Sequence, residues 1–150
     1  MIARELVIDV PVLPPSALSV NRRSHWAARA RATAEYGGIV RLCAVNARNL
    51  WIESAMATRN TIDVDWLPLK RCSIALVFTF PVKGRRGPLP DPDNLVSSCK
   101  CLIDALTARD RGNGCVGAGI IEDDREITLL PATIQRGEAN VRITIEEVLR

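Results

Sequence analysis

The sequence predicts an α+β domain with a mixed four-stranded sheet and two main helices packed on one face, in the order β-α-β-α-β-β. Three observations predict this class. Apolar residues alternate near the start, middle and end of the chain, as in half-buried strands. Two segments between them carry apolar residues at helical spacing, and Pro- or Gly-rich stretches separate the elements. We expect one domain over residues 1–150, because this length suits a single core and the chain has no internal repeat.

The first half of the chain supplies a strand and a helix. Residues 5–12 alternate and then meet Pro14 and Pro15, which predicts a strand entering a loop. Residues 26 to about 51 are expected to form a helix, because five apolar residues recur on one face. They are Tyr36, Val40, Cys43, Ala47 and Leu50. Gly37 and Gly38 weaken this helix and allow a bend.

The second half begins with a strand pattern over residues 72–80, which places Ile74, Leu76, Phe78 and Phe80 on one face. A basic loop over residues 81–90 follows. Asp91 is expected to cap a helix that has Pro92 at its first position and ends near residue 109. Residues 110–119 form a Gly-rich loop. Residues 126–134 and 140–148 alternate again, which predicts a closing hairpin.

The charge is unevenly distributed along a mildly basic chain with a net charge of +3. Residues 22–50 hold six arginines and one glutamate, whereas residues 91–126 hold eight acids and four bases. This balance permits a nucleic-acid partner without demanding one. Five cysteines and one histidine argue against a zinc site and a secreted disulfide framework, so we expect buried thiols. The chain shows no signal-peptide pattern and no apolar run of roughly 20 residues, which predicts a cytoplasmic protein.

Two acidic clusters flank the second predicted helix. Asp91 and Asp93 precede it, and Glu122, Asp123 and Asp124 follow the Gly-rich loop. Carboxylates that a fold brings together repel one another unless a cation lies between them, and a hard divalent cation suits such oxygen ligands. Each cluster alone also has an ordinary interpretation, as a helix cap or as a solvated turn. Taken together, the clusters favour a shared metal site.

Other kinds of site fit less well. A Ca²⁺ loop that began at Asp91 would need Gly at its sixth position and Glu at its twelfth, where the chain has Val96 and Leu102. A transferase that uses Asp91 and Asp93 as a DxD motif stays open, although that motif is unspecific and a chain of 150 residues leaves little room for a donor-binding domain. We interpret His25 as a phosphate-contacting or structural residue rather than a general base.

The ordered set of acids, lysine and glycine resembles the RusA-type Holliday-junction resolvases, especially phage-borne members. The resembling residues are Asp91, Asp93, Asn94, Leu95, Lys100, Asp104, Ala105, Leu106, Gly119, Ile120, Ile121, Asp123 and Asp124, with Leu13, Pro14, Pro15, Ser16, Asn21 and Arg22 near the start. The resemblance implies a RusA-like fold and a homodimeric, Mg²⁺-dependent endonuclease that resolves four-way junctions by paired phosphodiester hydrolysis, with Mn²⁺ as a substitute metal. Two features depart from the family: residues 107–118 form a longer link, and Lys100 lies further from Asp93.

The resemblance also implies roles for individual residues. Asp91, Asp93 and Asp124 match the essential, metal-binding carboxylates, Asp123 is the neighbouring metal-binding acid, and Lys100 matches the catalytic motif lysine. Basic residues on either side of the acids are the expected contacts to the DNA backbone: Lys83, Arg85, Arg86, Arg22, Arg23 and Arg29. Two related functions stay open at this point. The protein could cleave other branched DNA, such as flaps or forks, or it could bind branched DNA without cleaving it.

Overall fold

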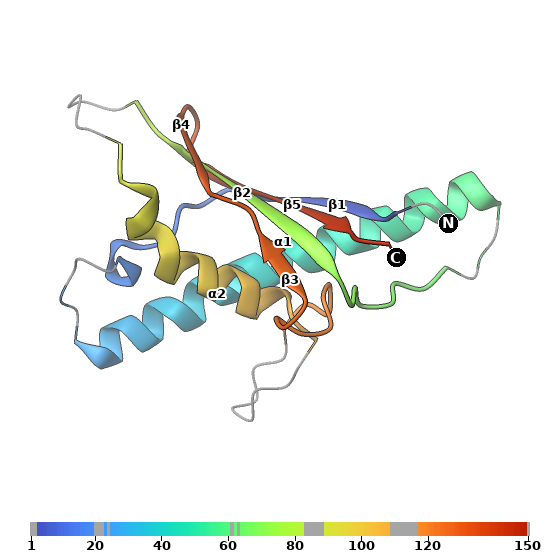
Figure 1. Cartoon of the computed structure of the whole chain (residues 1–150), viewed down its shortest axis with the longest axis horizontal. Helices are drawn as coiled ribbons and strands as arrows, with labels where there is room; N and C mark the ends of the chain where they lie inside the picture. Colours follow the sequence, from blue (N-terminus) through green and yellow to red (C-terminus); the bar gives the residue numbers. More distant parts are fainter. Residues whose placement is uncertain are drawn as a thin grey trace.

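The structure, a computed structural model, describes residues 3–19, 23, 25–60, 62, 64–82, 89–108 and 117–149. Two helices lie against a mixed sheet (Figure 1), so the expected α+β class is confirmed. The elements in chain order are β1 (Glu5–Val10), the 3₁₀ helix η1 (Ser16–Leu18), α1 (Trp26–Arg59), β2 (Cys72–Phe80), the 3₁₀ helix η2 (Pro92–Leu95), α2 (Val96–Leu106), β3 (Ile127–Leu129), β4 (Thr133–Arg136) and β5 (Asn140–Glu147).

The sheet has five strands rather than the expected four. Its order is β1-β5-β2-β3, and β4 also pairs with β2. β5 is antiparallel to both β1 and β2, whereas β3 and β4 run parallel to β2. The predicted hairpin between the last two strands is therefore wrong, since β4 and β5 lie on opposite sides of β2. β4 instead pairs in parallel with β2, which is distant in the sequence, and the local sequence gives no sign of this pairing.

The extra strand arises because one predicted strand is interrupted. Leu129 lies opposite Ile74 and Thr133 lies opposite Val77. An advance of four residues along the edge formed by β3 and β4 therefore matches an advance of three residues along β2. One additional residue is the signature of a β-bulge. Pro131 sits inside this interruption and has no N–H to donate to the ladder. The stretch from 126 to 134 therefore divides into β3 and β4.

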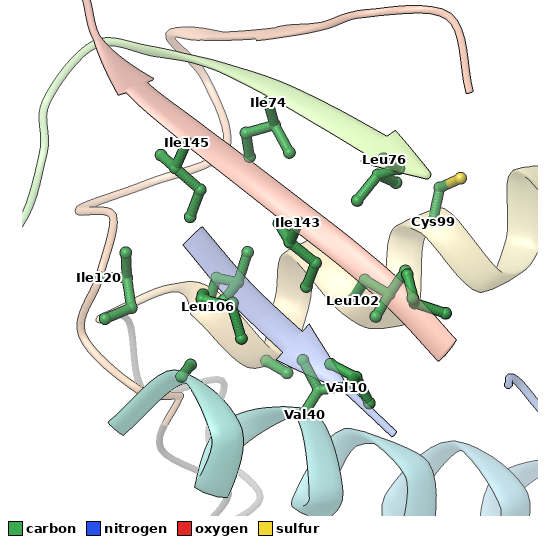
Figure 2. Packing of buried hydrophobic residues seen from close by; sticks show 14 of the residues in the cluster. Val10, Val40, Ile74, Leu76, Cys99, Leu102, Leu106, Ile120, Ile143 and Ile145 are labelled. Atoms are coloured by element: carbon green, nitrogen blue, oxygen red, sulfur yellow. The ribbon is translucent and has the colours of Figure 1, made fainter. Parts of the chain in front are cut away.

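The core lies between one face of the sheet and the two helices (Figure 2). Inward-facing residues alternate along the three longest strands, as the period of a strand requires. They are Leu6, Ile8 and Val10 of β1, Ile74, Leu76 and Phe78 of β2, and Val141, Ile143 and Ile145 of β5, all buried. The alternation predicted for residues 72–80 is thus confirmed, and that predicted for residues 5–12 holds as far as Val10, where β1 ends, whereas Val12 is exposed. Both helices cover the same face.

α1 runs further than expected, from Trp26 to Arg59, and ends where Asn60 adopts a left-handed conformation with φ of 49°. Its buried stripe consists of Tyr36, Val40 and Ala44. Leu50, which the apolar pattern had placed on this stripe, is 56% exposed. Although α1 has 34 residues, it is rich in polar side chains, and none of the described helices is long and apolar enough to cross a membrane.

The second predicted helix divides into η2 and α2. The Asn94 N–H donates to the Asp91 carbonyl at 2.9 Å, which closes a tight 3₁₀ turn over Pro92–Leu95 in place of an α-helical first turn. α2 then ends at Leu106, earlier than expected, because Thr107 turns to extended backbone and forms a bridge with Ile121. The core-facing stripe of α2 consists of Cys99, Leu102 and Leu106, continues the line of Leu95 in η2, and is buried.

The cysteines behave as expected for the four that the structure describes. Cys72, Cys99 and Cys101 are buried, Cys43 is half-buried, and all four are free thiols. Burial raises the pKa of Cys72 and of Cys101 to about 11, so both stay protonated near neutral pH. Cys115 lies outside the described residues.

Candidate functional site

The acidic pair Asp123 and Asp124 follows a segment that is held tightly against the end of α2. Ile121 forms parallel bridges with both Thr107 and Leu69, and the Glu122 N–H donates to the Leu69 carbonyl at 2.9 Å. The acids therefore emerge where three short parallel segments end together. This edge is where polar side chains can converge without disturbing the core.

Two glycines allow the segment to approach so closely. A Cβ atom at Gly117 would lie 2.0 Å from the Thr107 carbonyl oxygen, so no other residue fits there without backbone movement. Gly119 has φ of +68°, a conformation that L side chains rarely adopt. The glycines that made residues 110–119 read as a loop thus have a specific role at its described end, which is to seat the acidic pair beside α2.

A cavity of about 970 Å³ opens beside this acidic pair. Its charged lining comprises four bases and four acids: Arg4, Lys70, Arg71 and Arg125, with Glu122, Asp123, Glu126 and Glu147. Asp123 is engaged on both oxygens, accepting from the Asp124 N–H at 2.7 Å and pairing with Arg125 Nε at 3.3 Å. Arg71 and Glu126 form a further ion pair. The acids that line this cavity are therefore matched in number by arginine and lysine side chains.

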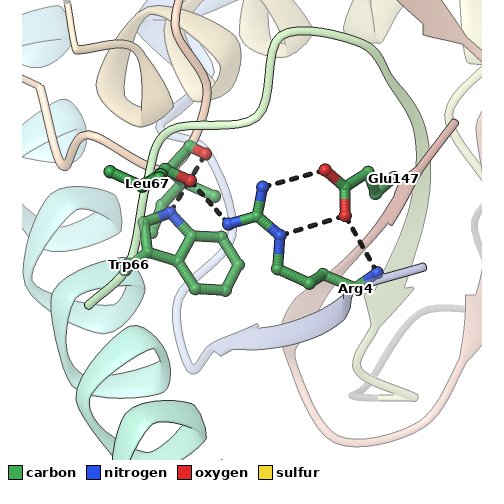
Figure 3. Close-up of polar contacts among 5 residues, drawn as sticks. Arg4, Trp66, Leu67 and Glu147 are labelled. Atoms are coloured by element: carbon green, nitrogen blue, oxygen red, sulfur yellow. Dashed lines mark hydrogen bonds and ion pairs between the residues drawn. The ribbon is translucent and has the colours of Figure 1, made fainter. Parts of the chain in front are cut away.

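Arg4 and Glu147 form one wall of the cavity and connect the start of β1 to the end of the neighbouring strand β5 (Figure 3). Arg4 donates from Nε and Nη2 to the two Glu147 carboxylate oxygens at 3.0 and 2.8 Å, and from Nη1 to the Leu67 carbonyl at 2.6 Å. Its guanidinium lies 5.0 Å from the Trp66 ring. The hydrogen bonds from Arg4 lower the pKa of Glu147.

This cluster was missed by sequence reasoning, because its members come from opposite ends of the chain. Trp66 also donates from Nε1 to the Ile120 carbonyl at 3.3 Å and packs edge-to-face on Trp51, with ring centroids 5.0 Å apart. The cluster therefore connects β1, β5 and α1 to the segment that carries Asp123 and Asp124. An Arg before the first strand and a Glu ending the last strand were the only signals, and they gain meaning only once β1 pairs with β5.

The second acidic pair, Asp91 and Asp93, lies at the other end of α2 (Figure 1). Both side chains are exposed. α2 contains 11 residues and so spans about 16 Å at 1.5 Å per residue. The other pair, Asp123 and Asp124, follows a segment that is held at the C-terminal end of α2, since the Ala118 N–H donates to the Ala105 carbonyl at 2.8 Å. The two pairs are thus too far apart within one chain to share a metal ion.

Lys100 lies on the exposed face of α2 and pairs with Asp104 one turn later, Nζ to Oδ1 at 3.5 Å. The lysine side chain is 67% exposed. Across the described ranges, no group of three or more His, Cys, Asp or Glu side chains is arranged to hold a metal ion. The expected site formed by Asp91, Asp93, Asp123 and Asp124 is accordingly not assembled by these residues of a single chain.

The expected DNA contacts are only partly described. Arg23 is exposed just before α1, and Arg29 is half-buried in its first turn. His25 caps this helix, accepting the Ala27 N–H on Nδ1 at 3.3 Å, which matches the structural interpretation of the histidine. The other predicted contacts lie outside the described residues: Lys83, Arg85, Arg86 and Arg22.

Comparison of the chain with models of protein families, with curated proteins and with solved structures finds no match in any of the three.

Proposed function

We propose that the protein is a Mg²⁺-dependent endonuclease of the RusA type, which cleaves branched DNA and resolves Holliday junctions by paired phosphodiester hydrolysis. The observation that carries this proposal is the solvent exposure of three of the predicted catalytic acids. Asp91, Asp93 and Asp124 are all exposed, so none of them is consumed by the core or by a buried ion pair. A protein that only bound DNA would gain nothing from such acids, since they repel phosphate.

The separation of the two pairs along α2 has a direct consequence for the proposed site. A metal ion that used both pairs would take Asp91 and Asp93 from one protomer and Asp123 and Asp124 from the other. A two-fold symmetric dimer would then carry two identical sites. A four-way junction has nearly the same symmetry and needs two incisions, so a dimer of this kind fits the substrate.

The donor set fits a hard cation, because every proposed ligand is a carboxylate oxygen and three of the four acids, Asp91, Asp93 and Asp124, are exposed. Mg²⁺ held by these acids would supply a water of lowered pKa and neutralise charge on the scissile phosphate, and Mn²⁺ would substitute for it. The chain's own residues add the rest. Lys100 is exposed enough to reach a phosphate oxygen, and Arg71 and Lys70 line the cavity beside Asp123, where they would hold the DNA backbone.

The experiment that tests the proposal is cleavage of an end-labelled synthetic four-way junction, with linear duplex as competitor, with and without Mg²⁺. We expect symmetric paired nicks that need the metal and are lost in Asp93→Asn. The same substitution should preserve or tighten junction binding, because it removes a charge that repels phosphate.

The outcome also separates the alternatives. Equal cleavage of flaps and forks would point to a general branched-DNA nuclease. Tight junction binding without cleavage in Mg²⁺ or Mn²⁺ would refute the enzyme and favour a non-catalytic binding module. Loss of junction binding in a folded Asp93→Asn protein would count against the role given to this acid.

A further inference from the structure

Trp26, the first residue of α1, presents a large aromatic ring to solvent. Its side chain is 76% exposed, whereas Trp51 and Trp66 are half-buried and pack on each other. An indole normally buries much of its surface, because removing apolar area from water is favourable by about 25 cal/mol per Å². Among the described residues, the Trp26 ring makes one ring contact, with its neighbour His25, at 5.7 Å between centroids. Most of the indole surface is thus available for a ligand.

The ring lies on the side of α1 that faces α2. Thr33 and Gly37 occupy this side, because Cys101 Sγ contacts the Thr33 carbonyl at 3.5 Å and a Cβ at Gly37 would be 3.8 Å from the same sulfur. Trp26 is two helical turns before Thr33 on the same stripe, or about 10 Å along the axis. α2 extends only about 7.5 Å in that direction from Cys101. The indole therefore stands on the α2-facing stripe, beyond the level of the first residue of α2, and its 76% exposure shows that η2, which precedes α2, leaves it largely uncovered.

This position is at the same end of the molecule as Asp91 and Asp93. At the opposite end, Arg48 of α1 donates to the Ala118 carbonyl beside the C-terminus of α2 at 3.0 Å, so the two helices run in the same direction. Figure 1 shows the starts of α1 and α2 on the same side of the molecule. A ligand held by the indole would therefore lie at the same end of the molecule as this acidic pair.

The charge around the ring selects the kind of ligand. Residues 22–34 contain four arginines and no acid, and Arg29 follows Trp26 by one turn on the same face. A second copy of the chain placed on this patch by two-fold symmetry would bring like charges together. A polyanion would be attracted. An aromatic face among arginines is the combination with which proteins hold unpaired nucleotides, by stacking the base and pairing the phosphates.

We propose that Trp26 is a stacking platform for an unpaired base of the DNA substrate, with Arg23 and Arg29 contacting the flanking phosphates. This inference rests on the proposed function for its nucleic-acid substrate, and it names the part of that substrate that is recognised. Because every base has a π-face, the platform tolerates any sequence and prefers single-stranded or unstacked nucleotides, which a branch point offers and a linear duplex does not.

The test is a tryptophan-fluorescence titration of the full chain with oligo(dT), with a four-way junction and with linear duplex, in the absence of Mg²⁺. Stacking quenches indole emission, so oligo(dT) and the junction should quench wild-type protein and should not quench Trp26→Ala through this site. The same variant should bind oligo(dT) about 5- to 100-fold more weakly, the range expected for one stacked base. The salt dependence of binding should stay unchanged, because stacking releases no counterions.

The matched control is Leu42→Ala, which removes a 70% exposed apolar side chain from the same helix and should leave quenching and affinity unchanged. Unaltered affinity of Trp26→Ala in a protein that still binds and cleaves junctions would overturn the stacking role and leave the proposed function intact. Absence of DNA binding by wild-type protein would overturn both. A Trp26 emission shift with anionic phospholipid vesicles, and none with DNA, would overturn the inference in favour of a lipid surface.

Discussion

The separation of the acidic pairs makes the shared metal site testable by mixing two inactive proteins. Asp93→Asn removes a carboxylate from one end of α2, and Asp124→Asn removes one beyond the other end. If each site draws one pair from each protomer, both sites of either homodimer are damaged and cleavage should be lost. In a heterodimer of the two variants, one site carries both substitutions and the other carries neither.

The expected recovery follows from counting. With random pairing, about half of the dimers are heterodimers with one intact site of two, so nicking should return to roughly a quarter of the wild-type level per protomer. Paired incision should stay absent, because it needs two working sites. Ligands drawn from one chain would give no recovery at all. That arrangement conflicts with a separation of about 16 Å along α2, since metal–oxygen distances are about 2 Å.

The assay is nicking of a supercoiled cruciform plasmid after the two variants are refolded together in equal amounts. A mixture of Asp91→Asn with Asp93→Asn is the control, because both substitutions lie at the same end and should not complement. Differently tagged protomers that co-purify would establish that heterodimers have formed. Heterodimers as inactive as the two parent proteins would refute the intersubunit site.

Three further predictions concern the frame of the site. Glu147→Gln should lower stability near neutral pH by about 1–2 kcal/mol, since the Arg4 hydrogen bonds lower the folded-state pKa of this partly buried carboxylate. The contribution of these hydrogen bonds is complete above the unfolded-state pKa of Glu and is lost as the pH falls through the lowered folded-state pKa. The free energy of unfolding, measured with urea across this pH range, should therefore vary less with pH in Glu147→Gln than in the wild type. Asp9→Asn, which breaks an exposed ion pair on the sheet, should change stability little. Gly117→Ala should lower the free energy of unfolding by roughly 2–3 kcal/mol, because its Cβ would meet a carbonyl oxygen at 2.0 Å, and an unchanged urea midpoint would contradict the described packing. Gly38→Ala should stabilise α1 by about 0.5–1 kcal/mol, since a Cβ there has nothing within 4 Å, and a lower melting temperature would argue against a continuous helix.

Local patterns were sufficient for the elements that bury one face. The strand predicted over residues 72–80 matches β2 in full, and the apolar stripe of the second predicted helix is the face of α2 that enters the core. In both cases side-chain period and burial are the same property, because a residue that repeats on one side must face the core or solvent together with its neighbours. Asp93 in η2 and Lys100 in α2 lie off this apolar stripe and are exposed.

Pairing between distant segments could not be predicted in this way. The polar turn after β4 looked like a hairpin, yet β4 joins one edge of β2 and β5 the other. The continuation of α1 from residue 52 to Arg59 was missed, since residues 56–69 show no clear apolar period. The Arg4–Glu147 pair was invisible for a similar reason, because 143 residues separate its members.

The candidate site was likewise predicted only in part from the sequence. The sequence by itself determined which carboxylates flank α2, in which order, and that they are not needed for the core, because residue type and period decide what can be buried. Only the tertiary structure decided how far apart they lie. α2 is a rigid rod of about 16 Å, and the bridge between Thr107 and Ile121 fixes the second pair at its far end. Acids that belong to one predicted site are thereby placed at opposite ends of a helix.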